Sequence, residues 1–237
     1  MVDRWFGRIV DTMDRLNLWD DTALIYTSDH GFYFGEHEII GKSIIEPNGP
    51  ARPHPLYNEV TRIPLVAHIP RVTSEGQKVD GYVQPQDIMP TILDLARVEA
   101  PGTMHGGSMV PLITGQRDRL REFAVSSHSI CSPVGGRPST IVTPDWTLIL
   151  GAPQPSSTAG SVPTTEAIDS RDRSEVPSPA AVTPQLYDNR ADPAMTNDVI
   201  AENLDVAGEL RDLYVGYLQS VGTSEEFIRP RRDARLA

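Results

Sequence analysis

The sequence predicts an α/β fold, in which part of a mostly parallel sheet flanked by helices is followed by a smaller sheet with a terminal helix. Three observations support this fold class. An amphipathic stretch at the start of the chain leads into a short apolar run, residues 23–27, as a crossover helix leads into a buried strand. A second apolar run, residues 63–69, precedes another helical pattern. Beyond about residue 118, short strand-like segments replace the long apolar runs.

The first element is predicted to be a helix that ends in a turn at Asn17. Its apolar residues recur at spacings of three and four, which places them on one stripe of a helix. They are Val2, Trp5, Phe6, Ile9, Val10, Met13 and Leu16. Asp3 is the expected N-cap, because a short acidic side chain can accept a hydrogen bond from the first free backbone N–H groups.

The two apolar runs are predicted to be strands buried on both faces, since they are continuous rather than alternating. In the second run, Pro64 lies near the start, where a strand tolerates a missing N–H group. A helix is expected over residues 88–98, capped by Asp87 and with Pro90 in its first turn.

The chain is predicted to divide into residues 1–117, part of a larger α/β domain, and residues 118–237, a smaller α+β subdomain. The smaller part should hold strands within residues 122–129, 139–146, 147–152 and 184–193, and a closing helix over residues 203–221. Residues 151–184 are rich in Pro, Ser, Thr and Ala, which predicts a low-complexity insertion. The charged tail from residue 225 is expected to be frayed.

Composition excludes several classes of function. A formal net charge of −11 and a pI near 4.9 disfavour binding to nucleic acid and suit a protein that holds a divalent cation. The single cysteine, Cys131, excludes an internal disulfide framework. No apolar run has the length of a transmembrane helix, and the first residues lack a signal-peptide layout. We therefore expect a soluble protein, with no membrane partner, in the cytoplasm or the periplasm.

The residues most suggestive of chemistry follow the first predicted strand. In open α/β sheets, ligands bind outside the carboxyl ends of the strands, where Asp29, His30 and Gly31 are expected to lie. Asp29 offers a hard carboxylate oxygen and His30 an imidazole nitrogen. Gly31 is expected to permit a sharp bend, because glycine tolerates positive φ. Two ligands are too few for a metal site, so further carboxylates would have to come from elsewhere.

Lys42 and His37 follow within the same short region. A lysine near a metal suits an oxygen of sulfate or phosphate on which charge develops, and His37 could donate to the same group or protonate a leaving group. The residue types also allow a plainer interpretation. Asp-His-Gly could form an Asx-type turn with a surface histidine, Lys42 could be a solvated charge, and His37 could be structural.

The order of the motifs resembles the carboxy-terminal half of the sulfatase family, in the alkaline-phosphatase-like superfamily. The first motifs are TSDHG (27–31), GEH (35–37), GK (41–42) and LYNEVTRIPLVAHIP (56–70). Later blocks are DIMPTILDLARVEAP (87–101), GGSMVPLITG (106–115) and LYDNRADPAMTND (186–198). The resemblance runs from residue 2 to about residue 221, interrupted by the insertion.

The resemblance implies a sulfuric ester hydrolase with a bound metal ion, usually calcium. Asp29 and His30 match the second pair of metal ligands of the family. Lys42 matches the lysine that contacts the sulfate, and Arg62 matches a structural position. His37 is near the pocket by sequence and is a catalytic candidate. The implied substrates are small sulfate esters or sulfated sugars.

The family's nucleophile is a formylglycine made from Cys or Ser in a C-x-P-x-R motif, and this motif and the first metal carboxylates precede the TSDHG block. Here only one predicted helix precedes it. Cys131 and Pro133 have the required spacing, but Gly135 stands where arginine is needed. We therefore expect a fragment without the nucleophile, inactive by itself, with a missing N-terminal half as a possible partner.

Two alternatives remain open at this point. A phosphonate monoester or phosphodiester hydrolase of the same superfamily would share these residues, because sulfate and phosphate esters are both tetrahedral. A non-catalytic remnant, or a partner-binding half of a split enzyme, would keep the motifs without turnover.

Overall fold

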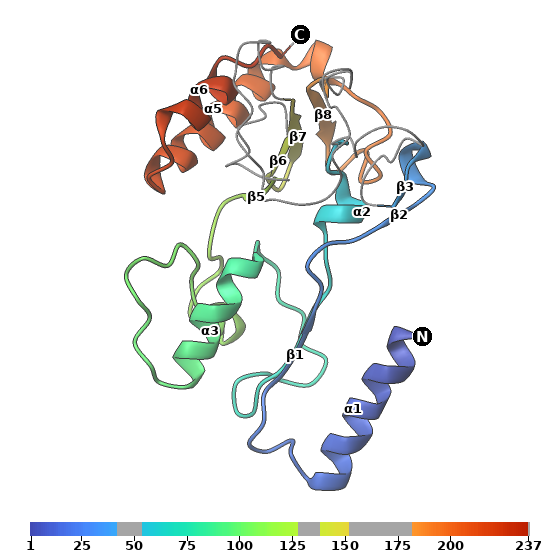
Figure 1. Cartoon of the computed structure of the whole chain (residues 1–237), viewed down its shortest axis with the longest axis vertical. Coiled ribbons are helices and arrows are strands. Elements are labelled where there is room, and N and C mark those ends of the chain that lie inside the picture. Colours follow the sequence, from blue (N-terminus) through green and yellow to red (C-terminus); the bar gives the residue numbers. More distant parts are fainter. Residues whose placement is uncertain (42–53, 128–137, 152–181, 237) are drawn as a thin grey trace, which may run out of the picture. The chain divides into compact units, whose positions relative to one another are not determined.

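The computed structural model describes residues 1–41, 54–127, 138–151 and 182–236 (Figure 1). These residues form two compact units, each described here by itself. The first unit comprises residues 1–29 and 63–122, and the second comprises residues 30–62 and 123–237. The chain thus passes from one unit to the other three times. The predicted domain boundary between residues 117 and 118 stays a prediction.

The first unit begins with helix α1, Val2–Leu16, which ends at Asn17 in the left-handed conformation. The N-cap is Met1 rather than the predicted Asp3, which lies in the first turn, where its charge favours the positive end of the helix dipole. The predicted apolar stripe is only partly buried. Met13 is buried and the ring of Phe6 contacts Tyr26, with centroids 4.8 Å apart, whereas Val2, Trp5, Ile9 and Leu16 are exposed.

Strands β1, Leu24–Thr27, and β4, Leu65–His68, lie side by side in a two-stranded sheet. Their pairing is antiparallel, with Leu24 opposite His68, whereas the sequence predicts a mostly parallel sheet for this part of the chain. Both strands are also only partly buried, instead of buried on both faces. A continuous apolar run predicts burial but carries no information about strand direction, since both kinds of ladder accept it.

The first unit continues with the short helix η2, Pro85–Asp87, and with α3, Ile88–Leu95, and α4, Val110–Ile113. Asp87 precedes α3 as predicted, but its side chain does not cap that helix. Its carboxylate instead accepts a hydrogen bond from the backbone N–H of Gln84, 2.7 Å away, and from that of Gly107, 2.9 Å away. Both carboxylate oxygens also bind the guanidinium of Arg121.

The second unit is built on a four-stranded antiparallel sheet in the order β5-β6-β7-β8, comprising Ala124–Ser127, Ser139–Val142, Trp146–Leu150 and Gln185–Asp188. After the short helix η4, Ile200–Glu202, helix α5, Leu204–Ser220, packs on this sheet (Figure 1). The main core forms between them from Ile141, Leu148, Leu150, Leu186, Ala207, Leu210, Tyr214 and Leu218. The smaller C-terminal sheet and its closing helix therefore occur as predicted.

The tail was wrongly expected to be frayed. Residues Glu225–Arg232 form helix α6, which packs against α5. Ile228 is buried in the main core, and Arg231 is buried with its guanidinium donating to the backbone oxygen of Phe227 at 2.6 Å. The high charge of the tail masked this apolar anchor, because Ile228 is the single strongly apolar side chain that the helix buries and Arg231 is buried beside it in spite of its charge.

The remaining elements of the second unit follow the Asp-His-Gly segment. They are β2, Tyr33–Phe34, the short helix η1, Glu36–Glu38, β3, Ile40–Gly41, and α2, Asn58–Thr61. A second core cluster joins them to the sheet and consists of Tyr33, Leu56, Tyr57, Val60, Ile149, Tyr187 and Met195. Thr140 of β6 donates to the backbone oxygen of Leu56 at 2.7 Å, which ties the start of the LYNEV segment to the sheet.

Several predictions fall outside the described residues: Lys42, Cys131 with its surroundings, and residues 152–181 of the predicted insertion. In the part of the chain that the structure describes, no helix is long and apolar enough to cross a membrane.

Candidate functional site

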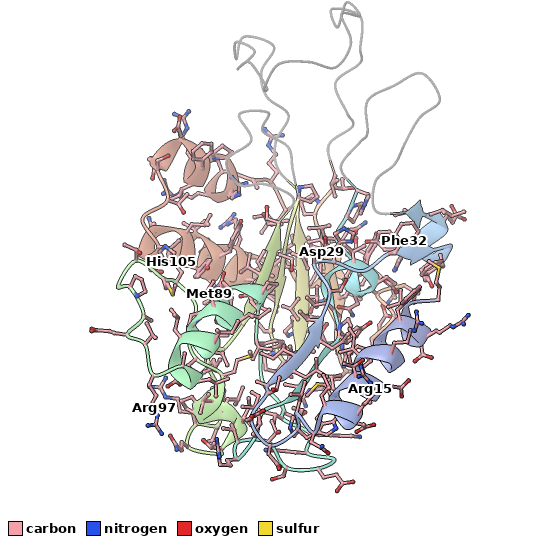
Figure 2. All side chains as sticks on the ribbon, turned by 60° about the horizontal axis from the view of Figure 1, so that its bottom comes forward. Arg15, Asp29, Phe32, Met89, Arg97 and His105 are labelled. Atoms are coloured by element: carbon pink, nitrogen blue, oxygen red, sulfur yellow. The ribbon has the colours of Figure 1, made fainter. Side chains whose placement is uncertain are left out.

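Asp29 lies two residues after the end of strand β1 (Figure 2), and His30 follows it in the chain. Asp29 is exposed to solvent, and its Oδ1 is 3.5 Å from the Oγ of Ser28. His30 is half-buried. The two residues are joined by a peptide bond, so a carboxylate and an imidazole are adjacent in the sequence just beyond the end of a strand.

The hydrogen bonding of His30 determines which ring nitrogen can bind a cation. Nδ1 lies 2.8 Å from the backbone oxygen of Gly31. A carbonyl oxygen only accepts hydrogen bonds, so Nδ1 carries the proton and, in the neutral ring, the lone pair is on Nε2. Metal-binding histidines commonly donate their other ring N–H to a carbonyl in this way. A carboxylate oxygen, as in Asp29, and an imidazole nitrogen, as in His30, are both donor types that divalent cations accept.

Gly31 is required for a different reason than the one predicted. Its φ angle is not in the positive region, so glycine's tolerance of that conformation is not used. A Cβ atom at this position would lie 1.8 Å from the backbone oxygen of Glu59. The backbone N–H of Gly31 also donates to the oxygen of Val60 at 2.9 Å. Only glycine allows the Asp-His-Gly segment to approach helix α2 this closely.

Tyr33 holds the same two segments together from inside the protein. Its side chain is fully buried, and its hydroxyl donates to the oxygen of Pro55 and accepts from the backbone N–H of Tyr57, both at 2.9 Å. Burial raises the pKa of the Tyr33 hydroxyl well above its usual value, so the group stays a hydrogen-bond donor at physiological pH. The segment that carries His30 is thereby attached to residues 55–60 by two separate links.

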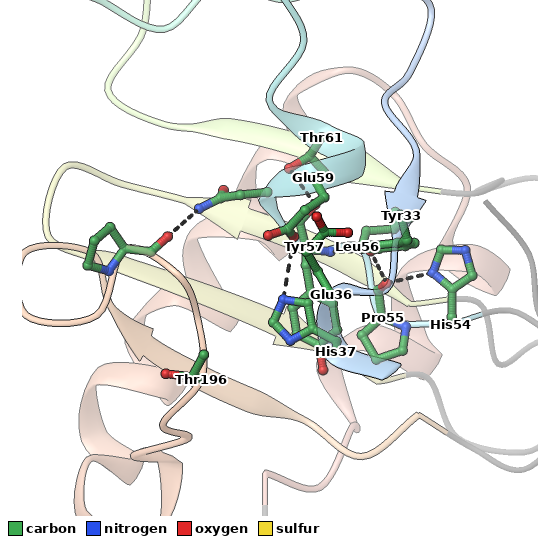
Figure 3. Close-up of polar contacts among 12 residues, drawn as sticks. Tyr33, Glu36, His37, His54, Pro55, Leu56, Tyr57, Glu59, Thr61 and Thr196 are labelled. Atoms are coloured by element: carbon green, nitrogen blue, oxygen red, sulfur yellow. Dashed lines mark hydrogen bonds and ion pairs between the residues drawn. The ribbon is translucent and has the colours of Figure 1, made fainter. Parts of the chain in front are cut away.

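His37 lies in η1 and packs against helix α2 (Figure 3). Its ring is stacked on that of Tyr57, with centroids 3.7 Å apart and an interplanar angle of 13°. Its Nε2 is 3.4 Å from Oε2 of Glu59. Sequence reasoning assigned a role to His37 but none to Tyr57 or Glu59, although both lie in the LYNEV motif that it singled out.

The late motif, residues 186–198, contacts the same region. The Tyr57 hydroxyl donates to Oε1 of Gln185 at 3.0 Å, and the amide of Asn58 donates to the oxygen of Pro193 at 3.2 Å. Burial alone would raise the pKa of Asp192. Hydrogen bonds from the backbone of Asn197 and from Thr196, together with the nearby His37, outweigh burial and hold that pKa below its usual value. Motifs far apart in the sequence thus converge around His37.

Among the described residues, no group of three or more His, Cys, Asp or Glu side chains is placed so that it could hold a metal ion. Asp29 and His30 are therefore a pair of potential ligands rather than a full coordination shell, since a divalent cation takes at least four ligands.

Comparison with known proteins identifies the family. Residues 1–98 match the family model of the sulfatases. These residues belong to the sulfatase family. An N-acetylglucosamine-6-O-sulfatase of Bacteroides thetaiotaomicron is 30% identical over 115 residues, which are 48% of this chain and 19% of that protein.

Solved structures extend the likeness to nearly the whole chain. The structure of BT4656 in complex with its substrate D-glucosamine-2-N,6-O-disulfate superposes with a TM-score of 0.68 at 24% identity, covering 98% of this chain and 40% of that one. The phosphonate monoester hydrolase of Silicibacter pomeroyi gives a TM-score of 0.62 at 22% identity, covering 92% of this chain and 38% of that one. The α/β fold of the sulfatases is therefore confirmed, and the chain spans well under half the length of these relatives.

Proposed function

We propose that this chain contributes the second pair of metal ligands and a sulfate-binding lysine to a sulfuric ester hydrolase. The hydrogen bond between His30 Nδ1 and the Gly31 oxygen carries the proposal, because it leaves the lone pair on Nε2, in the residue that follows the hard carboxylate of Asp29. When bound, a divalent cation, most suitably calcium, would attract the sulfate oxygens and stabilise the charge that develops on them. Membership of the sulfatase family supports this assignment.

The other site residues have distinct proposed roles. Lys42 follows the described segment by one residue and would hold a sulfate oxygen through its ammonium group. His37 would donate a proton to the leaving-group oxygen. The nucleophile would be a formylglycine, and we assign it to no residue of this chain. Hydrolysis would therefore require a nucleophile supplied by further polypeptide.

Sulfated sugars are the proposed substrate class. Two similar proteins support it: the relative named as an N-acetylglucosamine-6-O-sulfatase, and BT4656, whose structure contains a disulfated glucosamine as its substrate. A second candidate is the hydrolysis of phosphonate monoesters, which the likeness to the Silicibacter enzyme favours. Both reactions would use the same metal ligands, because the sulfur and the phosphorus of these esters are both tetrahedral atoms that carry oxygens which a cation can bind.

Binding of a cation tests the proposed metal pair. We expect terbium luminescence, and its displacement by calcium, to reveal a weak site in the purified chain. His30→Ala and Asp29→Asn should each lower the affinity at least tenfold, since each removes one of two ligands. Asp20→Asn is the matched control, because Asp20 is an exposed acid in the turn before β1. Equal binding by all four proteins would contradict the assignment.

Turnover tests whether the site is incomplete. The purified 237-residue chain should not hydrolyse 4-methylumbelliferyl sulfate above the buffer rate, with or without added calcium, because no nucleophile is assigned in it. The measurement is the release of fluorescent product over hours at micromolar protein. Turnover that disappears in His30→Ala would show that the chain holds a complete site, and the need for further polypeptide would then be wrong.

A further inference from the structure

The backbone around His37 is held in an unusual conformation. His37 has φ 53° and Glu38 has φ 60°, so two successive residues other than glycine occupy the left-handed region, and Gly35 before them has φ 126°. Single residues of this kind are uncommon, and they persist where the surrounding structure determines them. Backbone strain of this sort is concentrated at functional sites, so the contacts that hold His37 are of interest.

Two side chains hold the imidazole ring, one from helix α2 and one from the residue that caps its N-terminus (Figure 3). Tyr57 covers one face of the ring, and Glu59 meets its edge at Nε2. The side chains of His37 and Glu59 are only 13% and 23% exposed, so solvent screens their interaction weakly. Turning the ring out of its plane would break the stack, and flipping it by 180° would break the contact with the carboxylate, so the ring has one preferred orientation.

Glu59 has no competing partner for the oxygen that faces His37. Oε2 of Glu59 is buried and has no hydrogen-bond partner among the described residues, and the Nε2 of His37 lies 3.4 Å from it. A buried carboxylate oxygen without compensation is costly, so the N–H of His37 belongs on Nε2, where it offsets that cost. Asp192, whose pKa His37 helps to lower, is a second acid in the same surroundings.

We propose that Glu59 is a positioning residue for His37: its carboxylate holds the proton on Nε2 and leaves Nδ1 as the nitrogen that exchanges a proton with the ester. The assignment of Nδ1 as the nitrogen that exchanges a proton with the ester rests on the proposed function. The assignment of the other ring proton to Nε2 does not, because it rests on the contact with Glu59. In the step itself, the Nδ1–H bond of the imidazolium breaks and its proton goes to the leaving-group oxygen. That oxygen takes the electron pair of the S–O bond, which breaks as the oxygen of the nucleophile forms its own bond to sulfur, and the neutral ring that remains keeps its Nε2–H towards Glu59.

Nitrogen NMR of the histidine rings tests the tautomer directly. The chain has six histidines, and the signals of His37 are assigned by their loss in His37→Asn. Two-bond ¹H–¹⁵N correlation spectra at high pH should show His37 as a single Nε2–H tautomer. Glu59→Ala should convert it to a mixture, whereas Glu59→Gln should keep the single tautomer because an amide oxygen still accepts. Glu38→Gln, the matched change at an exposed neighbour, should have no effect.

The outcomes separate the two proposals. An Nδ1–H tautomer in the wild-type chain would overturn the positioning role, and so would a Glu59→Ala spectrum in which His37 is unchanged. The wild-type spectrum decides the question even if Glu59→Ala does not fold. If His37 shows the expected tautomers while His30→Ala binds cations as well as the wild-type chain does, the positioning role stands and the proposed metal pair is wrong.

Discussion

Arg121→Met should destabilise the first unit by about 3–5 kcal/mol, because it leaves the Asp87 carboxylate buried without a counter-charge. Asp87 is 0% exposed and Arg121 17%, and the guanidinium binds both carboxylate oxygens. Urea unfolding measures the loss. Trp5 and Trp19 belong to the first unit and Trp146 to the second, so fluorescence in a Trp146→Phe background reports on the first unit.

Arg119→Met is the matched control for this prediction. Arg119 forms an ion pair with Glu122 in which both side chains are more than half exposed, so its loss should change the free energy of unfolding by less than about 1 kcal/mol. If Arg121→Met were as mild as Arg119→Met, the buried pair would not be a main support of the first unit.

The shifted pKa of the Asp87 carboxylate predicts how the stability of the first unit depends on pH. Burial by itself would raise the pKa of Asp87, but hydrogen bonds from Arg121, Gly107 and Gln84 outweigh it and hold the pKa below its usual value. A depressed folded-state pKa stabilises the fold above the unfolded value, near 3.9 for aspartate, and this stability is lost as pH falls through the folded value. Arg121→Met should therefore weaken the dependence of first-unit stability on pH in this acid range.

Gly31→Ala should destabilise the second unit by about 2–4 kcal/mol. The added Cβ would lie 1.8 Å from the backbone oxygen of Glu59, and backbone cannot move aside as the end of a flexible side chain can. The hydrogen bond from the Gly31 N–H to Val60 should be lost at the same time. Urea unfolding followed by Trp146, in a background with Trp5 and Trp19 changed to phenylalanine, measures the effect.

Gly208→Ala is expected to have the opposite effect on the stability of the same unit. Gly208 lies within helix α5, and a Cβ atom there would meet nothing within 4 Å. Alanine is favoured over glycine inside a helix, so this variant should be stabilised by up to about 1 kcal/mol. Equal effects at the two positions would show that the close approach of Gly31 to helix α2 does not matter.

The sequence by itself determined the elements that depend on local patterns. The 3.6-residue period predicted α1 and α5 to within one or two residues, because a helix forms where one stripe of side chains can be buried. The order of several motifs indicated the sulfatase family, which the family model confirms for residues 1–98. The acid–histidine pair at the end of β1 was also evident from residue types and from its place after an apolar run.

Tertiary structure decided what depends on contacts between distant segments. It showed that β1 and β4 pair antiparallel, because a continuous apolar run is compatible with either direction. It showed that Gly31 serves close packing on Glu59 rather than a positive φ angle, since the partner is 28 positions away in the chain. The partners of His37 likewise emerge only when helix α2 folds back on η1, because Tyr57 and Glu59 carry no sequence signal of where their side chains point.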